Sequence, residues 1–146
     1  MKQMQYKKLA RNDFGKKYEI LAEGDFLDSH YLIVSFFSHP CAYIFCDEKH
    51  PLYKKDYSVI NDEVEINVNG GLTYSRMGRS FQDGKSVLPD HWCLGWDYAH
   101  CDDFMRCPSL DIEGKKWTTA EILYQVKSAI NDIAAWCSKN KKWGKL

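Results

Sequence analysis

The stretch WTTAEILYQVKSAINDIAAWCS, residues 117–138, determines the fold class because it carries the clearest helical pattern in the chain. Thr118 and Glu121 match the T-x-x-E capping box. In that motif each of the two side chains accepts a hydrogen bond from a backbone N–H that the first helical turn leaves unpaired. Trp117 precedes the cap and can pack on Ile122 as a hydrophobic staple. A helix is therefore predicted to begin at this point.

The apolar residues that follow recur at helical spacing and so define one buried side of the helix. We expect this amphipathic helix to run from Thr119 to Ser138, with a basic C-terminal tail at about 139–146. The positions that share the buried side are Ile122, Val126, Ala129, Ile130, Ile133 and Cys137.

Several short β-rich runs precede the helix. His39-Pro40 indicates a tight antiparallel connection between two of them. Asn69-Gly70-Gly71 is a hairpin signal between two others. Strands followed by a single amphipathic helix predict an α+β fold of one domain, residues 1–146. We expect a mainly antiparallel sheet with the long C-terminal helix packed on one face. The predicted strands are 18–23, 30–38, 41–46, 63–68, 71–77 and 91–97, and the predicted loops are 47–62, 78–90 and 102–116.

Composition excludes several classes of protein. The 146 residues have a formal net charge of zero, which argues against general nucleic-acid binding because that function needs a basic face. The longest apolar run, residues 31–37, is too short to span a bilayer. No basic-then-apolar export signal opens the chain, so we expect an intracellular location. Aromatic residues make up 14%, more than a core of this size needs, which indicates a ring-stacking pocket or an oligomer interface, and we expect a homodimer or larger closed homo-oligomer.

The cysteines do not follow a metal-site pattern. Tetrahedral zinc sites normally use closely spaced ligand pairs, and the chain has no C-x-x-C. Without an export signal, reduced thiols are the expected state. The six cysteines are Cys41, Cys46, Cys93, Cys101, Cys107 and Cys137.

Three polar segments carry more functional groups than a sheet protein needs. They are HPLYKKDY at 50–57, NGGLTYS at 69–75 and GWDYAHCDD at 95–103. The double glycine allows a ligand to approach the backbone, and lysine supplies a countercharge for phosphate. We expect the three segments to converge on one ligand pocket. The candidate ligand-binding residues are His50, Tyr53, Lys55, Asp56, Asn69, Gly70, Gly71, Thr73, Tyr74, Ser75, Trp96, Asp97 and His100.

A catalytic interpretation and a structural one stay open beside the binding interpretation. In an enzyme, His50 and His100 would act in acid–base chemistry together with Asp97. The pattern Asp97-x-x-His100-x-x-Asp103, with Asp102 alongside, has plausible ligands for a divalent metal. The same residues could also serve only as turn formers and loop-closing hydrogen bonds. No P-loop, GxSxG or HExxH motif occurs, and no cofactor is predicted.

These segments, in this order, resemble a small uncharacterised family found widely in phages and prophages. Its pattern contains a Cys-x-Tyr strand, HPLY-x-KDY, an HGGLTYS-like turn, GFD-x-AH-x-D and a C-terminal helix. The resemblance covers roughly residues 41–138 and begins at Cys41-Ala42-Tyr43. At position 69 this chain has Asn where the family tends to have His. Asn cannot take up a proton at neutral pH, so the difference weighs against an enzyme that depends on that position.

The resemblance implies a phage or prophage accessory protein in the host cytoplasm. Such proteins often interfere with host defence, and some sequester nucleotide signals. The aromatic, Lys and Asp residues fit that chemistry, since rings stack on bases, ammonium groups bind phosphate and carboxylates bind ribose hydroxyls. We therefore expect capture of a small anionic ligand such as a cyclic or modified nucleotide. The alternatives are a metal-dependent phosphodiesterase acting on a nucleotide and a protein-binding inhibitor of a host defence complex.

Overall fold

The computed structural model describes residues 9–11, 17–80, 86–100, 102–106 and 110–144. Six strands form one sheet in the order β1-β2-β3-β4-β6-β5, and every neighbouring pair is antiparallel. The elements are β1 (Leu9–Arg11), β2 (Lys17–Phe26), β3 (Ser29–Ser35), β4 (Pro40–Cys46), α1 (Tyr57–Glu63), β5 (Tyr74–Ser80), β6 (Ser86–Asp97) and α2 (Thr119–Gly144).

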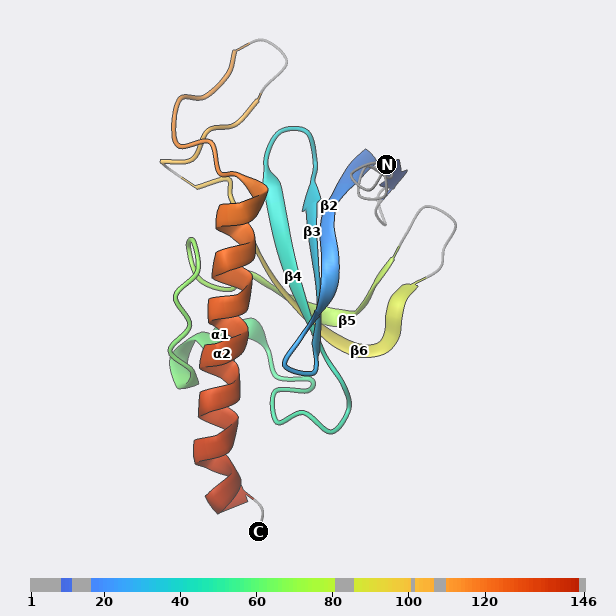
Figure 1. Ribbon diagram of the computed structural model, residues 1–146, viewed down its shortest axis with the longest axis vertical. Coiled ribbons are helices and arrows are strands. Elements are labelled where there is room, and N and C mark those ends of the chain that lie inside the picture. Colours follow the sequence, from blue (N-terminus) through green and yellow to red (C-terminus); the bar gives the residue numbers. More distant parts are fainter. Residues whose placement is uncertain (1–8, 12–16, 81–85, 101, 107–109, 145–146) are drawn as a thin grey trace.

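Helix α2 lies along one face of the sheet and packs against β2, β3 and β4 (Figure 1). Its buried side, which includes Ile122, Val126 and Ile130, joins one hydrophobic cluster with sheet residues such as Ile33 and Ile44. The predicted α+β fold, with an antiparallel sheet and the C-terminal helix on one face, is confirmed. No helix in the described part of the chain is long and apolar enough to cross a membrane.

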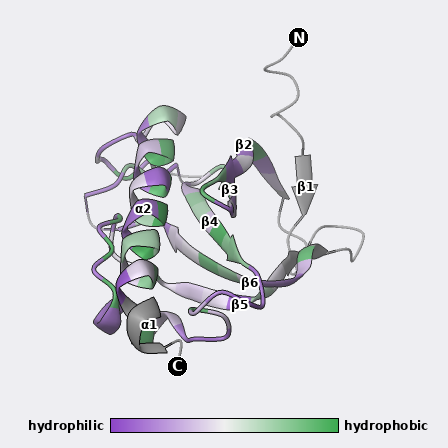
Figure 2. Ribbon diagram, turned by 60° about the horizontal axis from the view of Figure 1, so that its bottom comes forward, coloured by the Kyte–Doolittle hydropathy of each residue, from purple (hydrophilic) through white to green (hydrophobic). Residues whose placement is uncertain are grey.

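The opposite face of the sheet carries a second buried cluster, which includes Tyr18, Leu32, Tyr43 and Phe45. Strand β4 contributes to both clusters, because alternate residues of a strand point to opposite faces. A strand buried on both faces is a continuous apolar run rather than an alternating one. This explains the sequence CAYIFC at 41–46 and the predominantly green colour of β4 in Figure 2.

The predicted strand at 63–68 is wrong. Residues 57–63 form α1, whose N-cap Asp56 accepts a hydrogen bond from the Ser58 backbone N–H. The helix ends at Glu63 with Val64 as its C-cap, and the chain then runs to a turn closed by Gly71 N–H donating to the Val68 carbonyl at 3.0 Å. Val64 and Val68 are buried against the α2 core, so the alternation reported burial correctly although no strand pairs with this segment.

Two further boundaries differ from the prediction. The region 78–90 was expected to be a loop, but β5 continues to Ser80 and β6 begins at Ser86. Gly78 has a φ of 58° where the register of the two strands shifts, so a bulge, not a loop, accounts for this glycine. Helix α2 continues to Gly144, and most of the predicted basic tail is therefore helical.

The capping box at the start of α2 forms as predicted. Glu121 N–H donates to Thr118 Oγ1 at 3.1 Å, and Thr118 N–H donates to Glu121 Oε1 at 2.9 Å. The hydrogen bonds from Thr118 and Lys115 lower the pKa of Glu121 below its usual value. Trp117 packs on the core cluster that contains Ile122, in agreement with the expected staple position.

Thr118→Ala is expected to lower the free energy of unfolding by about 1 kcal/mol, because one helix N–H loses its acceptor. Urea unfolding followed by circular dichroism measures the change. Thr118→Ser keeps the hydroxyl and is expected to retain most of the stability. A loss of equal size in both variants would contradict the role of the cap.

Candidate functional site

The predicted site residues separate into two clusters at different heights along α2. We call the first the Asp103 cluster: Asn69, Gly70, Asp97, His100, Asp103 and Trp117. The second, the Cys137 cluster, comprises Cys46, His50, Lys55, Trp136 and Cys137. Asn69 N–H donates to Gln125 Oε1 at 3.3 Å, whereas Lys55 Nζ lies 5.9 Å from the centre of the Trp136 ring. From Gln125 to Trp136 the helix rises about 16 Å. The structure therefore does not bring the three sequence segments into one pocket.

Asp103 is the centre of its cluster. Only 3% of the residue is exposed, and its carboxylate accepts three N–H groups from three separate segments. Asn69 Nδ2 and the His100 backbone N–H donate to Oδ2 at 2.7 and 2.9 Å, and Trp117 Nε1 donates to Oδ1 at 2.9 Å. These bonds join the 69–71 turn, the end of β6 and the start of α2.

Asp97 and His100 form a half-exposed pair beside this carboxylate. His100 Nε2 lies 3.2 Å from Asp97 Oδ1, within ion-pair range, but the geometry does not make a hydrogen bond. Gly70 covers the imidazole so closely that a Cβ at position 70 would lie 2.3 Å from Nε2. The second and third sequence segments thus meet as predicted, through Gly70 and His100.

Trp96 was predicted to offer a ring to the ligand, and this prediction is wrong. Only 1% of Trp96 is exposed, and its Nε1 donates to Tyr98 Oη at 2.8 Å. Tyr98 in turn donates to Gln125 Oε1 at 2.6 Å. Burial raises the pKa of Tyr98 well above its ordinary value, so the phenol stays a donor at all ordinary pH values. The Trp96 indole is part of the core beneath the Asp103 cluster.

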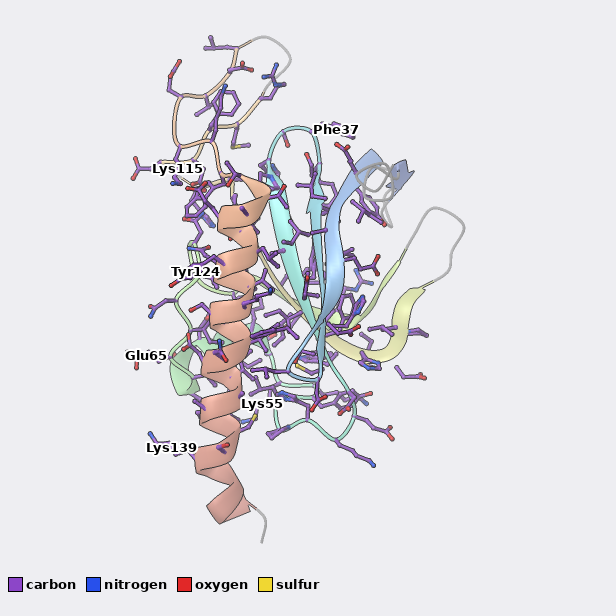
Figure 3. The ribbon with its side chains drawn as sticks, in the orientation of Figure 1. Phe37, Lys55, Glu65, Lys115, Tyr124 and Lys139 are labelled. Carbon is purple, nitrogen blue, oxygen red and sulfur yellow. The ribbon has the colours of Figure 1, made fainter. Side chains whose placement is uncertain are left out.

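The HPLYKKDY segment lies beside the C-terminal half of α2. Lys55 Nζ forms an ion pair with Glu63 Oε1 at 2.8 Å, which already balances the charge expected to meet a phosphate. Figure 3 shows Lys55 and Lys115 at different heights of α2. Tyr53 Oη donates to the Asp90 carbonyl at 3.1 Å. The Asp56 carboxyl is exposed, and the hydrogen bonds that it accepts from Ser58 lower its pKa.

The remaining predicted residues form turns and strand contacts. Thr73 is exposed, and its N–H donates to the Gly95 carbonyl at 2.9 Å. The Tyr74 ring packs edge-on against Tyr43 on the sheet face opposite α2. Ser75 Oγ accepts the Tyr57 N–H at 3.1 Å and thus supports the start of α1.

Sequence reasoning missed a surface of rings and cations on the segment between β6 and α2. We call it the cation–ring surface: Phe104, Arg106, Lys115, Lys116 and Trp117. Lys116 Nζ lies 4.5 Å and Arg106 Cζ 5.9 Å from the centre of the Phe104 ring, and Lys115 Nζ lies 4.6 Å from that of Trp117. Its two halves pair through Phe104 N–H and the Lys115 carbonyl at 2.9 Å.

The surface is hard to recognise in the sequence because its two halves, residues 104–106 and 115–117, are separated by eight residues of the chain. The pairs Phe104/Arg106 and Lys115/Lys116 look like ordinary loop residues until the isolated bridges Asp103–Lys115 and Met105–Ile112 bring them together. Phe104 follows Asp103 in the chain, and Asp103 accepts the His100 backbone N–H at 2.9 Å.

A metal centre has no support among the residues that the structure describes, where no group of three His, Cys, Asp or Glu side chains could hold an ion. Both oxygens of Asp103, one of the proposed ligands, already accept N–H donors. Searches of known protein families, of curated proteins and of solved structures found no match to this chain.

Asp103→Ala is expected to destabilise the fold by about 3 kcal/mol or more, since it leaves three partly buried N–H donors without their acceptor. Asp102→Ala removes the neighbouring exposed carboxylate and is expected to cost less than about 0.5 kcal/mol. Urea unfolding of both variants tests the difference, and equal stabilities would contradict the central role of Asp103.

Gly70→Ala is expected to cost about 2 kcal/mol or more, because the new methyl combines a positive φ with the contact against His100. Gly71 has a similar φ of 77°, but a Cβ there would lie 3.6 Å from Asn61 Oδ1. Gly71→Ala should therefore cost only about 1 kcal/mol. In a His100→Ala background the two glycine substitutions should become equally costly; a persistent difference would show that His100 is not the obstacle.

Proposed function

We propose that this protein binds a small anionic ligand of the nucleotide class at the cation–ring surface. The observation that carries the proposal is the pairing of the Phe104 ring with Arg106 and Lys116. Among the described residues, neither cation has a carboxylate within salt-bridge distance, in contrast to Lys55 and Lys115. Cations without an acidic partner can bind phosphate, and an adjacent ring can stack on a base.

The Asp97–His100 pair, whose His100 backbone N–H donates to Asp103 at the start of the same segment, supports a nucleotide over simple inorganic phosphate. Both side chains are about one-third exposed. A carboxylate accepts hydrogen bonds from sugar hydroxyls, and a base edge offers donors and acceptors to an imidazole. The resemblance to a phage and prophage family supports the biological setting that we propose, namely sequestration of a host nucleotide signal in the host cytoplasm.

A second candidate function, a protein-binding inhibitor of a host complex, is favoured by a separate observation. Leu110 is 75% exposed, and Ile112 is also exposed on the same segment as the cations. Exposed aliphatic side chains next to a polar rim are typical of protein interfaces. The homo-oligomer stays a prediction. Several of the aromatic side chains on which it was based, such as Tyr18, Tyr43 and Tyr98, are buried in the core of the single chain, whereas Tyr124 is exposed and points away from it (Figure 3).

The double substitution Arg106→Ala/Lys116→Ala is expected to weaken nucleotide binding about a hundredfold or more, since each of the two charged hydrogen bonds contributes at least about 1.4 kcal/mol. Isothermal titration calorimetry with a panel of linear and cyclic nucleotides measures the affinity. Lys139→Ala, which removes an exposed cation at the far end of α2, is the matched control and should leave binding unchanged (Figure 3).

Mass spectrometry of the bound fraction separates the alternatives. Intact ligand supports binding, and a cleaved product would instead support the phosphodiesterase. If the double variant and Lys139→Ala weakened nucleotide binding equally, the loss would come from the change in net charge, and the proposed site would be contradicted. Absence of binding across the panel would favour the protein-binding function.

A further inference from the structure

Cys137 and His50 meet between the sheet and the C-terminal half of α2, at a place that the proposed nucleotide site does not use, and Cys46 belongs to the hydrophobic cluster against which Cys137 packs. Cys46 is the last residue of β4 and is 1% exposed, and Cys137 packs against the same core cluster from α2. Cys137 Sγ lies 3.9 Å from His50 Nε2. Both cysteines carry thiols and not a disulfide.

The hydrogen bonds of His50 determine which ring nitrogen carries the proton. Its Nδ1 accepts the Leu52 backbone N–H at 3.0 Å, so the proton of the neutral ring must lie on Nε2. Burial lowers the pKa of His50, against the opposing effect of Asp47, and favours this neutral form. The Nε2–H group therefore faces the sulfur of Cys137 as a donor, which stabilises a thiolate relative to a thiol.

Cys46 has the opposite environment. Burial raises its pKa to about 12, with further increases from the neighbouring Cys137 and Asp47. At neutral pH Cys46 is thus a protonated, weakly nucleophilic thiol. Cys137 is only partly buried and can meet a small reagent from solution. The two sulfurs differ in reactivity in the way that an attacking and a resolving cysteine differ.

We propose that Cys137 is a hydroperoxide-reactive cysteine and that Cys46 resolves it into a disulfide joining α2 to β4. In the first step the Cys137 thiolate attacks a peroxide oxygen, the O–O bond breaks, and a sulfenic acid and hydroxide (or alkoxide) result. In the second step the Cys46 sulfur attacks the sulfenic sulfur, an S–S bond forms and water leaves. Two cysteines are oxidised, and one peroxide is reduced.

The first step favours the second. The negative charge of the Cys137 thiolate contributes to the raised pKa of Cys46. The sulfenic acid that replaces this thiolate is neutral at ordinary pH. Oxidation of Cys137 therefore removes one of the contributions that keep Cys46 protonated. Burial remains the larger contribution, so resolution should be slower than the peroxide step.

Stoichiometric hydrogen peroxide tests the proposal on the full chain. Of the six cysteines, two should become unreactive toward a thiol reagent, with a mass loss of about 2 Da and a Cys46–Cys137 cross-linked peptide. Cys46→Ser should leave a sulfenic acid at Cys137 that dimedone traps. Cys137→Ser should lose no thiols under the same conditions, and Cys93→Ser, on the opposite sheet face, should behave as wild type.

His50→Asn isolates the contribution of the imidazole. The Asn Oδ1 can still accept the Leu52 N–H, but the donor toward Cys137 is gone. Alkylation of Cys137 by iodoacetamide at pH 7 should slow several-fold, because the donor that stabilises its thiolate is gone, with Cys93 unaffected. A disulfide through any other cysteine, an unchanged thiol count, or an unchanged alkylation rate in His50→Asn would overturn the proposal.

Discussion

The buried carboxylate of Asp103 is the constraint on which the arrangement of the 69–71 turn, the end of β6 and the start of α2 depends. A carboxylate removed from water needs hydrogen bonds to compensate its lost hydration, and here three N–H groups supply them. Because the donors come from Asn69, His100 and Trp117, one side chain positions a turn, the end of β6 and the entry to α2. The cation–ring surface begins at the next residue, Phe104, and its position is fixed by the same contacts.

The polar side chains of these sequence segments therefore serve mainly to hold separate parts of the fold together. Asn69 is an example, because its side chain donates to Asp103 and its backbone N–H to Gln125. Two groups of side chains remain available to a ligand outside the hydrogen bonds of Asp103. They are the Asp97–His100 pair and the Phe104 ring with its two cations, Arg106 and Lys116.

Much of the fold could be predicted from the sequence because its signals are local. The capping box at Thr118 and the periodic apolar side of α2 depend on neighbours within a few residues, and both are confirmed. The prediction of a strand at 63–68 was wrong because alternating apolar residues indicate which side chains are buried and not which strands pair. A β-strand needs a partner strand, and the local sequence pattern does not specify one. The site was harder still, since Phe104 meets Lys116, and Cys137 meets His50, only through contacts between distant parts of the chain.

The strand order has a consequence for how binding competence arises. Strands β2, β3 and β4 are neighbours in sequence and in the sheet, so they can pair through short connections. Pairing of β4 with β6, by contrast, must close the chain between Cys46 and Trp92, which carries a larger loop entropy and belongs to slow, non-local folding. The Asp103 cluster joins the end of β6 to the 69–71 turn and to the start of α2, so it needs these distant segments to be assembled. A ligand at the cation–ring surface would thus recognise only the completed fold, and by linkage it would stabilise the entire domain against global unfolding.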